Sequence, residues 1–124
     1  TSDEIAIDAA MRACEVEAFA DKPVTQLSGG ERARVLLARA MAAEAPILLV
    51  SGALDPATPP EGPARMLPGL PNARHLVFAG GGHSAANFTG LDKIIEEFIR
   101  EGSAADLDVT AVDTNRPPPF VLPQ

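Results

Sequence analysis

The sequence predicts a small α/β domain in which two helices precede a β-α-β-α order and an extended, proline-rich C-terminal tail follows. Residues 31–44 and 91–101 place apolar side chains at helical spacing. In contrast, Ile47-Leu48-Leu49-Val50 is a short continuous apolar run, as expected of a strand buried on both faces. This alternation predicts parallel strands joined by a right-handed crossover. With 124 residues, we expect a single domain over the whole chain and one hydrophobic core.

The first two predicted elements are helices over residues 3–20 and 31–44. Ser2 or Asp3 is a candidate N-cap of the first helix, and Pro46 ends the second. The remaining predicted elements are a strand over 47–50, a short helix over 61–67, a strand over 75–79 and a helix over 91–101 that ends at Gly102.

The C-terminal residues 106–124 combine alternating apolar side chains with several prolines. They predict an extended tail packed against the surface, with one possible edge strand over 107–112. Two strands are too few for a stable open sheet. We therefore expect either a homodimer joined through its sheet edges or a third strand from the tail, and we rank the homodimer first.

Composition excludes several classes of partner. The net charge of −7 argues against nucleic acid, because no basic stripe is present to neutralise phosphates. The single cysteine, Cys14, allows neither an internal disulfide nor a cysteine metal cluster, so no metal site is expected. No apolar stretch approaches the ~18 residues of a membrane span, and no targeting pattern is visible. We expect a cytoplasmic protein that does not enter the membrane.

The run Leu27-Ser28-Gly29-Gly30-Glu31 opens the second predicted helix and is the most distinctive motif of the chain. Glycines at a helix start expose backbone N–H groups, which suit an anion. With its flanks, over about residues 1–48, this segment resembles the signature segment of ATP-binding-cassette (ABC) ATPases, in particular those of haem importers. In that family the serine and glycines contact the γ-phosphate of ATP held by another subunit, which implies Ser28, Gly29 and Gly30 as phosphate contacts.

The other parts of a nucleotide hydrolase are missing from the sequence. No G-x-x-x-x-G-K-[ST] loop occurs, and the strand at Ile47 is not followed by the Asp-Glu pair that would hold Mg²⁺ and water. We expect no bound cofactor and no nucleotide hydrolysis. The structural alternative is that Ser28-Gly29-Gly30 serves as a loop and N-cap that support the helix. We prefer this explanation to retained anion binding.

A second set of motifs follows the predicted strands. These are Ser51-Gly52-Ala53-Leu54-Asp55-Pro56-Ala57-Thr58-Pro59 after the first strand and Gly80-Gly81-Gly82-His83-Ser84 after the second. From about residue 46 to the end, the chain resembles the C-terminal part of α/β-hydrolase serine peptidases of the tripeptidyl-aminopeptidase type. The resemblance implies that Asp55 and His83 are two members of a catalytic triad. Both follow adjacent parallel strands, where α/β sheets place their sites, so contact between them is expected.

The third triad member is missing, because no G-x-S-x-G nucleophile elbow occurs. The chain is therefore expected to join an ABC-like segment, 1–46, to a hydrolase-like segment, 47–124, within a strand that suits either fold. An engineered or synthetic chimera explains the loss of both machineries more simply than natural recombination does. We expect no intact catalytic function. The alternatives are a weak nucleotide- or anion-binding module at Ser28-Gly29-Gly30 and a residual esterase that uses Asp55 and His83.

Overall fold

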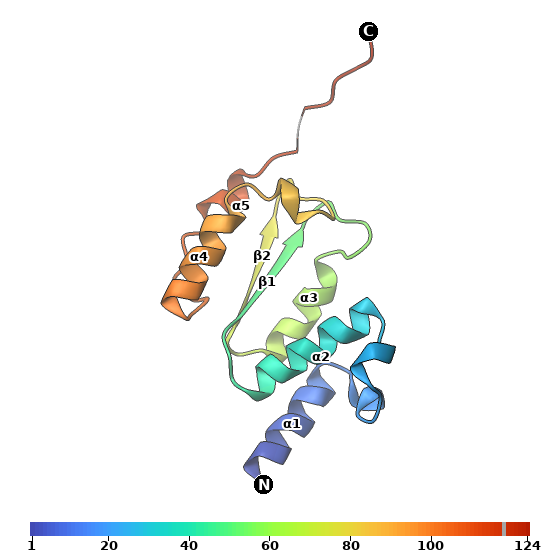
Figure 1. Cartoon of the computed structure of the whole chain (residues 1–124). Helices are drawn as coiled ribbons and strands as arrows, with labels where there is room; N and C mark the ends of the chain where they lie inside the picture. Colours follow the sequence, from blue (N-terminus) through green and yellow to red (C-terminus); the bar gives the residue numbers. More distant parts are fainter. Residues whose placement is uncertain (118) are drawn as a thin grey trace.

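The computed structural model describes residues 1–117 and 119–124, and it confirms a small α/β arrangement (Figure 1). The helices and strands are α1 (Ser2–Ala13), α2 (Gly29–Ala42), β1 (Ile47–Gly52), α3 (Glu61–Met66), β2 (Ala73–Phe78), α4 (Leu91–Glu101) and α5 (Thr110–Thr114). Short 3-10 turns lie at Glu17–Phe19, Val24–Gln26, Leu67–Gly69 and Ala85–Asn87.

The two strands form a parallel pair, with Ile47 opposite Ala73 at one end and Gly52 opposite Phe78 at the other. Within the described residues the sheet has these two strands alone. In Figure 1, α4 and α5 lie on one side of the strands, and α1 and α2 lie at the opposite end of the molecule from the C-terminus.

The buried apolar residues form two clusters, so the expectation of one core was wrong. The first cluster joins the strands to α4 and α5, and its buried members are Leu76, Phe78, Phe88, Ile94, Leu107 and Val112. Within it, Phe78 is fully buried and stacks on Phe88, with ring centroids 4.7 Å apart. The second cluster lies mainly between α1 and α2 and comprises Ala10, Cys14, Val16 and Ala38. The split arises because α1 and α2 bury their apolar faces chiefly against each other.

The first helix is shorter than predicted. It ends at Ala13, and Glu15 then takes a left-handed conformation with φ 55°, which turns the chain out of the helix. Val16 is nevertheless buried, so the apolar spacing continues where the helix does not. Thr1, rather than Ser2 or Asp3, is the N-cap, because its hydroxyl accepts a hydrogen bond from the Glu4 N–H.

The other boundaries are closer to the prediction. Helix α2 begins two residues earlier than expected and ends at Ala42, and Glu44 then adopts a φ of 54° ahead of Pro46. Helix α4 has the predicted bounds and ends at Gly102, which has a left-handed φ of 64°.

The predicted edge strand over 107–112 is absent from the described structure. Asp108 Oδ1 accepts hydrogen bonds from the N–H and the hydroxyl of Thr110, and this local turn leads into helix α5 instead. Val112 is buried, and its carbonyl accepts one bond from the Ala79 N–H at the end of β2.

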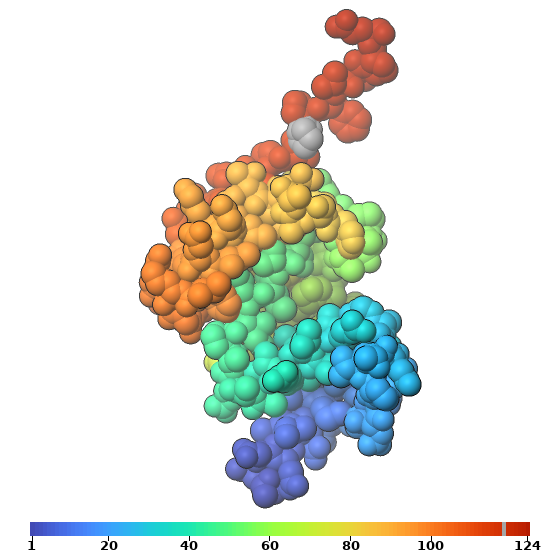
Figure 2. Space-filling view, viewed as in Figure 1, coloured from blue at the N-terminus to red at the C-terminus, as the bar shows by residue number. Residues whose placement is uncertain are grey.

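The end of the tail also departs from the prediction. Phe120 is 101% exposed, and Val121 and Leu122 are almost as exposed, so this part of the tail does not pack on the surface. Figures 1 and 2 show it leaving the domain. Because residues 107–112 form no strand and the described sheet has two strands, the tail alternative for completing the sheet was wrong.

Candidate functional site

Asp55 and His83 meet at the carboxyl end of the two-stranded sheet. Asp55 follows β1 and His83 follows β2. The Nδ1 atom of His83 lies 3.0 Å from Oδ2 and 3.2 Å from Oδ1 of Asp55. The two residues implied as triad members thus lie within hydrogen-bonding distance of each other.

Glycines allow the two loops to approach closely enough for this contact. A side chain at Gly52 would collide with the carbonyl oxygens of Gly81 and Gly82. The Leu54 N–H donates to the Gly81 carbonyl over 2.9 Å, which ties the loop after β1 to the loop after β2. The Ser-Gly-Ala-Leu-Asp and Gly-Gly-Gly-His segments therefore fix the site through their backbones.

Asp55 is buried and strongly hydrogen-bonded. Thr58 Oγ1 donates to Oδ2 over 2.6 Å, and the N–H groups of Thr58 and Ala57 donate to Oδ1 over 3.0 and 2.9 Å. The hydrogen bonds from Thr58, with smaller contributions from His83 and Ala57, hold the pKa of Asp55 well below its usual range. Asp55 is therefore an ionised carboxylate at neutral pH.

Thr58 is the site residue that the sequence interpretation missed. Its hydroxyl contacts Asp55 and also lies 3.3 Å from His83 Nδ1. The available signal was its spacing, because a threonine three residues after an aspartate is well placed to bond that side chain within a turn.

The two ring nitrogens of His83 lie in different surroundings. Nδ1 faces the buried carboxylate, whereas the side chain as a whole is 65% exposed. Within the described part of the chain, Nδ1 alone of the two ring nitrogens has a hydrogen-bond partner. No serine hydroxyl in that part bonds to Nε2, where a triad would place its nucleophile.

Four serines use their hydroxyls elsewhere. Ser84, beside His83, accepts from the Ala86 N–H, and Ser103 accepts from the Ala105 N–H. Ser51 Oγ lies 2.8 Å from His75 Nε2, and Ser28 caps α2. The Ser51 contact gives His75 a polar partner, and burial lowers the pKa of His75.

The segment Ser28-Gly29-Gly30 opens α2 as a capping box. Ser28 Oγ accepts from the Glu31 N–H over 3.2 Å, and the Glu31 carboxylate accepts from the Ser28 N–H over 2.9 Å. The bond from the Ser28 backbone lowers the pKa of Glu31. A carboxylate thus already lies at the helix start, which disfavours a second anion there.

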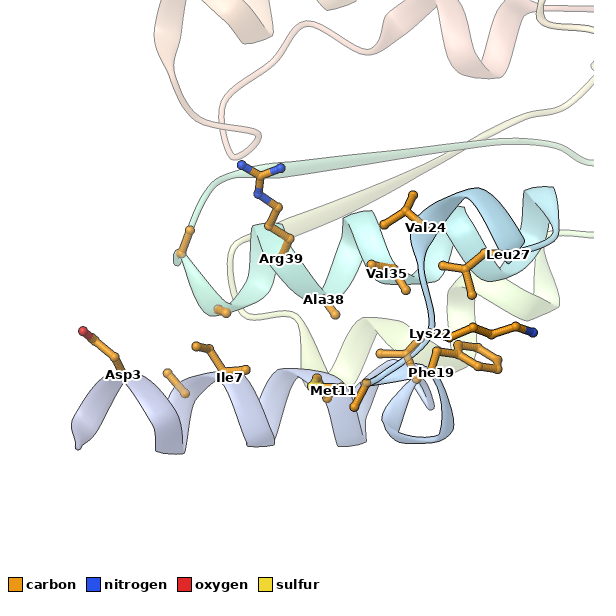
Figure 3. A pocket seen from close by; sticks show the side chains of 15 residues that line it. Asp3, Ile7, Met11, Phe19, Lys22, Val24, Leu27, Val35, Ala38 and Arg39 are labelled. Carbon is orange, nitrogen blue, oxygen red and sulfur yellow. The ribbon is translucent and has the colours of Figure 1, made fainter.

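An apolar groove of about 590 Å³ runs between α1 and α2 (Figure 3). Met11, Phe19 and Val35 are among its lining residues, and Asp3, Lys22 and Arg39 add charge. It includes neither the Asp55–His83 pair nor Ser28-Gly29-Gly30.

Among the described residues we find no group of three potential metal-ligating side chains. None of the helices in this part of the chain has the length and apolar character needed to cross a bilayer.

Comparison with curated proteins reveals partial similarity to ABC ATPases. The chain is 55% identical over 56 residues to the hemin import ATP-binding protein HmuV of Rhodococcus jostii, covering 43% of this chain and 19% of that protein. It is 54% identical over 56 residues to HmuV of Streptomyces coelicolor, covering 43% and 20% respectively. The cobalamin import ATP-binding protein BtuD of Halobacterium salinarum is 55% identical over 49 residues, or 40% of this chain and 12% of BtuD. The chain thus spans a fifth or less of the length of these relatives.

No solved structure matches the chain. A family model described as "TAP-like protein", of the α/β-hydrolase type, matches residues 17–111. This range includes Asp55, Thr58 and His83, and it also reaches back across the Ser28-Gly29-Gly30 segment. Since the match covers most of the sequence, the chain belongs to the TAP-like family of α/β-hydrolases.

Proposed function

We propose that this chain carries the aspartate and histidine of a hydrolase site without the nucleophile, and that its 124 residues have no intact catalytic function. The observation that supports this most directly is the environment of His83. Its Nδ1 is paired with the buried Asp55, whereas no serine hydroxyl of the described residues bonds to Nε2.

An Asp–His pair can orient and polarise an imidazole, but acyl transfer needs more. A serine must attack the carbonyl, and N–H donors must stabilise the oxyanion that forms. Ser84 follows His83 directly and is engaged with the Ala86 N–H, which makes it a poor substitute for the nucleophile. A residual esterase that uses water or an improvised serine is therefore the less favoured candidate.

Hydrolysis of a p-nitrophenyl ester tests this proposal. We expect the chain to release p-nitrophenol at the rate of buffer alone, and His83→Ala to leave that rate unchanged. The matched control is His75→Ala, which removes the other histidine. Turnover above buffer that is lost in His83→Ala and kept in His75→Ala would contradict the proposal.

We also propose that the chain is a chimera, engineered or recombined, in which the ABC-like segment serves as a packed helical pair and not as a nucleotide site. The partial ABC matches and the separate α1–α2 cluster support this origin. Because the two clusters have no residue in common, native-state hydrogen exchange should give different opening free energies for α2 and for β2 with α4. One common value across both clusters would show that they open as one unit, which would contradict the α1–α2 pair as a separate packed unit.

The homodimer proposal rests on the edges of the sheet. On the outer edge of β2, the Ala79 N–H is bonded to Val112 and the Ala73 N–H to Leu70. On the outer edge of β1, the Gly52 carbonyl accepts a bond from the Asp55 N–H, whereas the backbone groups of Leu48 and Val50 have no backbone partner among the described residues. Because open sheet edges of this kind pair readily, we propose that β1 of one chain pairs with β1 of a second copy.

A further inference from the structure

We propose that Thr58 is a positioning residue of the Asp55–His83 pair, and that its hydroxyl selects the imidazole tautomer that carries its proton on Nδ1. The inference deepens the proposed function and rests on the Asp–His pair described above. Its basis is the juxtaposition of one hydroxyl with both partners, 2.6 Å from Asp55 Oδ2 and 3.3 Å from His83 Nδ1.

The hydroxyl of Thr58 has one proton, and its position assigns that proton to Asp55. The distance of 2.6 Å is that of a strong O–H···O⁻ bond to an ionised carboxylate. With the proton committed, the lone pairs of Oγ1 remain, and these can only accept. Nδ1 of His83 therefore faces acceptors alone: the two oxygens of Asp55 and the oxygen of Thr58.

A ring nitrogen surrounded by acceptors is stabilised as an N–H donor. Neutral His83 must then leave Nε2 unprotonated, with its lone pair on the exposed side of the ring. This is the form in which a histidine acts as a general base toward a hydroxyl. Thr58 thereby helps to prepare the ring for a nucleophile, although its own contacts are with Asp55 and Nδ1 and not with Nε2.

Thr58 also holds the carboxylate in place. Its N–H bonds to Oδ1 while its hydroxyl bonds to Oδ2, so both oxygens of Asp55 are fixed by one residue. Without the hydroxyl, Oδ2 would keep His83 as its remaining partner among the described residues, and the carboxylate could turn about Oδ1, which the N–H groups of Thr58 and Ala57 would still hold. A rotated carboxylate would no longer hold the Nδ1–H form firmly.

The chain contains a matched control for this role. Thr110 donates its hydroxyl to Asp108 Oδ1 over 2.7 Å and its N–H to the same oxygen over 3.1 Å. This is the same Asp–Thr chemistry in a turn, but no histidine takes part in the hydrogen bonds that the described residues make with this pair. Thr110→Val therefore measures the effect of losing such a bond on stability, without an effect on His83.

The test is ¹⁵N NMR of the full chain at alkaline pH, well above the ordinary histidine pKa of about 6.5. The chain has two histidines, so His75→Ala assigns both sets of ring signals. In the unsubstituted chain we expect the signals of His83 to show Nδ1–H and unprotonated Nε2. In Thr58→Val the proportion of the Nε2–H form should rise, because Nδ1 loses one acceptor while Asp55 remains, whereas Thr58→Ser should restore the original pattern.

Thr110→Val should leave the signals of His83 unchanged, and the signals of His75, which is bonded to Ser51, serve as an internal check of folding. If Thr58→Val does not fold, Thr58→Ala gives the same comparison with less steric change. An unaltered Nδ1–H tautomer in folded Thr58→Val or Thr58→Ala would overturn the role of Thr58 and leave the Asp55–His83 pair intact. An Nε2–H tautomer in the unsubstituted chain would overturn the pairing itself.

Discussion

The Nδ1 atom of His83 lies 3.0 Å from Oδ2 of Asp55, yet the side chain of Asp55 is 5% exposed while that of His83 is 65% exposed. The carboxylate is therefore fixed inside the loop, and the imidazole reaches from it toward solvent. A contact of this kind orients the ring at a modest energetic cost, because the exposed partner keeps most of its hydration.

Asp55→Asn should make the free energy of unfolding depend less steeply on pH in the acid range. The folded-state pKa of Asp55 is depressed, so its stabilising effect is complete above the unfolded-state pKa of about 3.9 and is lost as pH falls toward the folded value. Urea unfolding at a series of pH values should show Asp55→Asn less stable than the unsubstituted chain at pH 7. The difference should shrink progressively below about pH 5.

Asp21→Asn is the control for this acid series, because Asp21 is exposed and none of the hydrogen bonds found among the described residues involves its side chain. Its effect on the free energy of unfolding should be small at every pH. A difference between Asp55→Asn and the unsubstituted chain that stayed constant down to pH 2 would refute the depressed pKa.

Ser28→Ala should lower the free energy of unfolding by about 1 kcal/mol, the usual cost of losing an N-cap. The physical reason is the bond that Ser28 Oγ accepts from the Glu31 N–H. Ser28→Thr keeps a capping oxygen and should remain close to the unsubstituted chain. Calorimetric titration with ATP, with and without Mg²⁺, should give no heat of binding in any of the three proteins. Saturable ATP binding that is lost in Ser28→Ala would favour the nucleotide-binding alternative.

Replacing each of two glycines by alanine should change the free energy of unfolding in opposite directions. Gly102 ends α4 with φ 64°, and an L side chain in this left-handed conformation costs about 1–2 kcal/mol. Gly30 lies in the first turn of α2, where an added Cβ meets no atom within 4 Å. Gly30→Ala should therefore raise the free energy of unfolding by up to about 1 kcal/mol. Thermal unfolding that ranked Gly102→Ala above Gly30→Ala would be inconsistent with these backbone conformations.

The parts of the fold that could be predicted from sequence are those in which local pattern and tertiary packing agree. Helix α4 has apolar residues on one face and a glycine in the left-handed position after it, and both signals are local. The contact between Asp55 and His83 could be predicted because adjacent parallel strands bring their carboxyl ends to the same edge of the sheet. The helix required residue types and their order alone, whereas the choice of Asp55 and His83 also rested on the resemblance to a peptidase family.

The wrong predictions concern apolar residues that are buried although they do not belong to the helix or strand that their spacing suggested. Val16 lies after the end of the first helix but is buried, so its apolar spacing extended the predicted helix beyond Ala13. Leu107 and Val112 are buried around the short helix α5, and their spacing suggested a strand. Thr58 was overlooked because its role depends on a side chain that is distant in sequence, His83, coming within reach.

Leu48→Pro should convert the proposed homodimer into a monomer. The N–H groups of Ile47 and Ala53 donate toward β2, to the carbonyls of Asn72 and Phe78. Because N–H directions alternate along a strand in a parallel ladder, the N–H of Leu48 points to the open edge of β1. A proline there removes a donor that the β1–β2 ladder does not use, so the fold should persist while edge pairing with a second chain is lost.

The leucine side chain of residue 48 also packs against the first cluster, so Leu48→Ala is the matched control. It loses the same packing, at a cost of about 2–5 kcal/mol if the site were fully buried and less at this half-buried position, but it keeps the N–H. Light scattering coupled to size-exclusion chromatography should give a dimer for the unsubstituted chain and for folded Leu48→Ala, and a monomer for Leu48→Pro. A monomer in the unsubstituted chain, or a dimer that survives in Leu48→Pro, would show that the edge of β1 is not the interface.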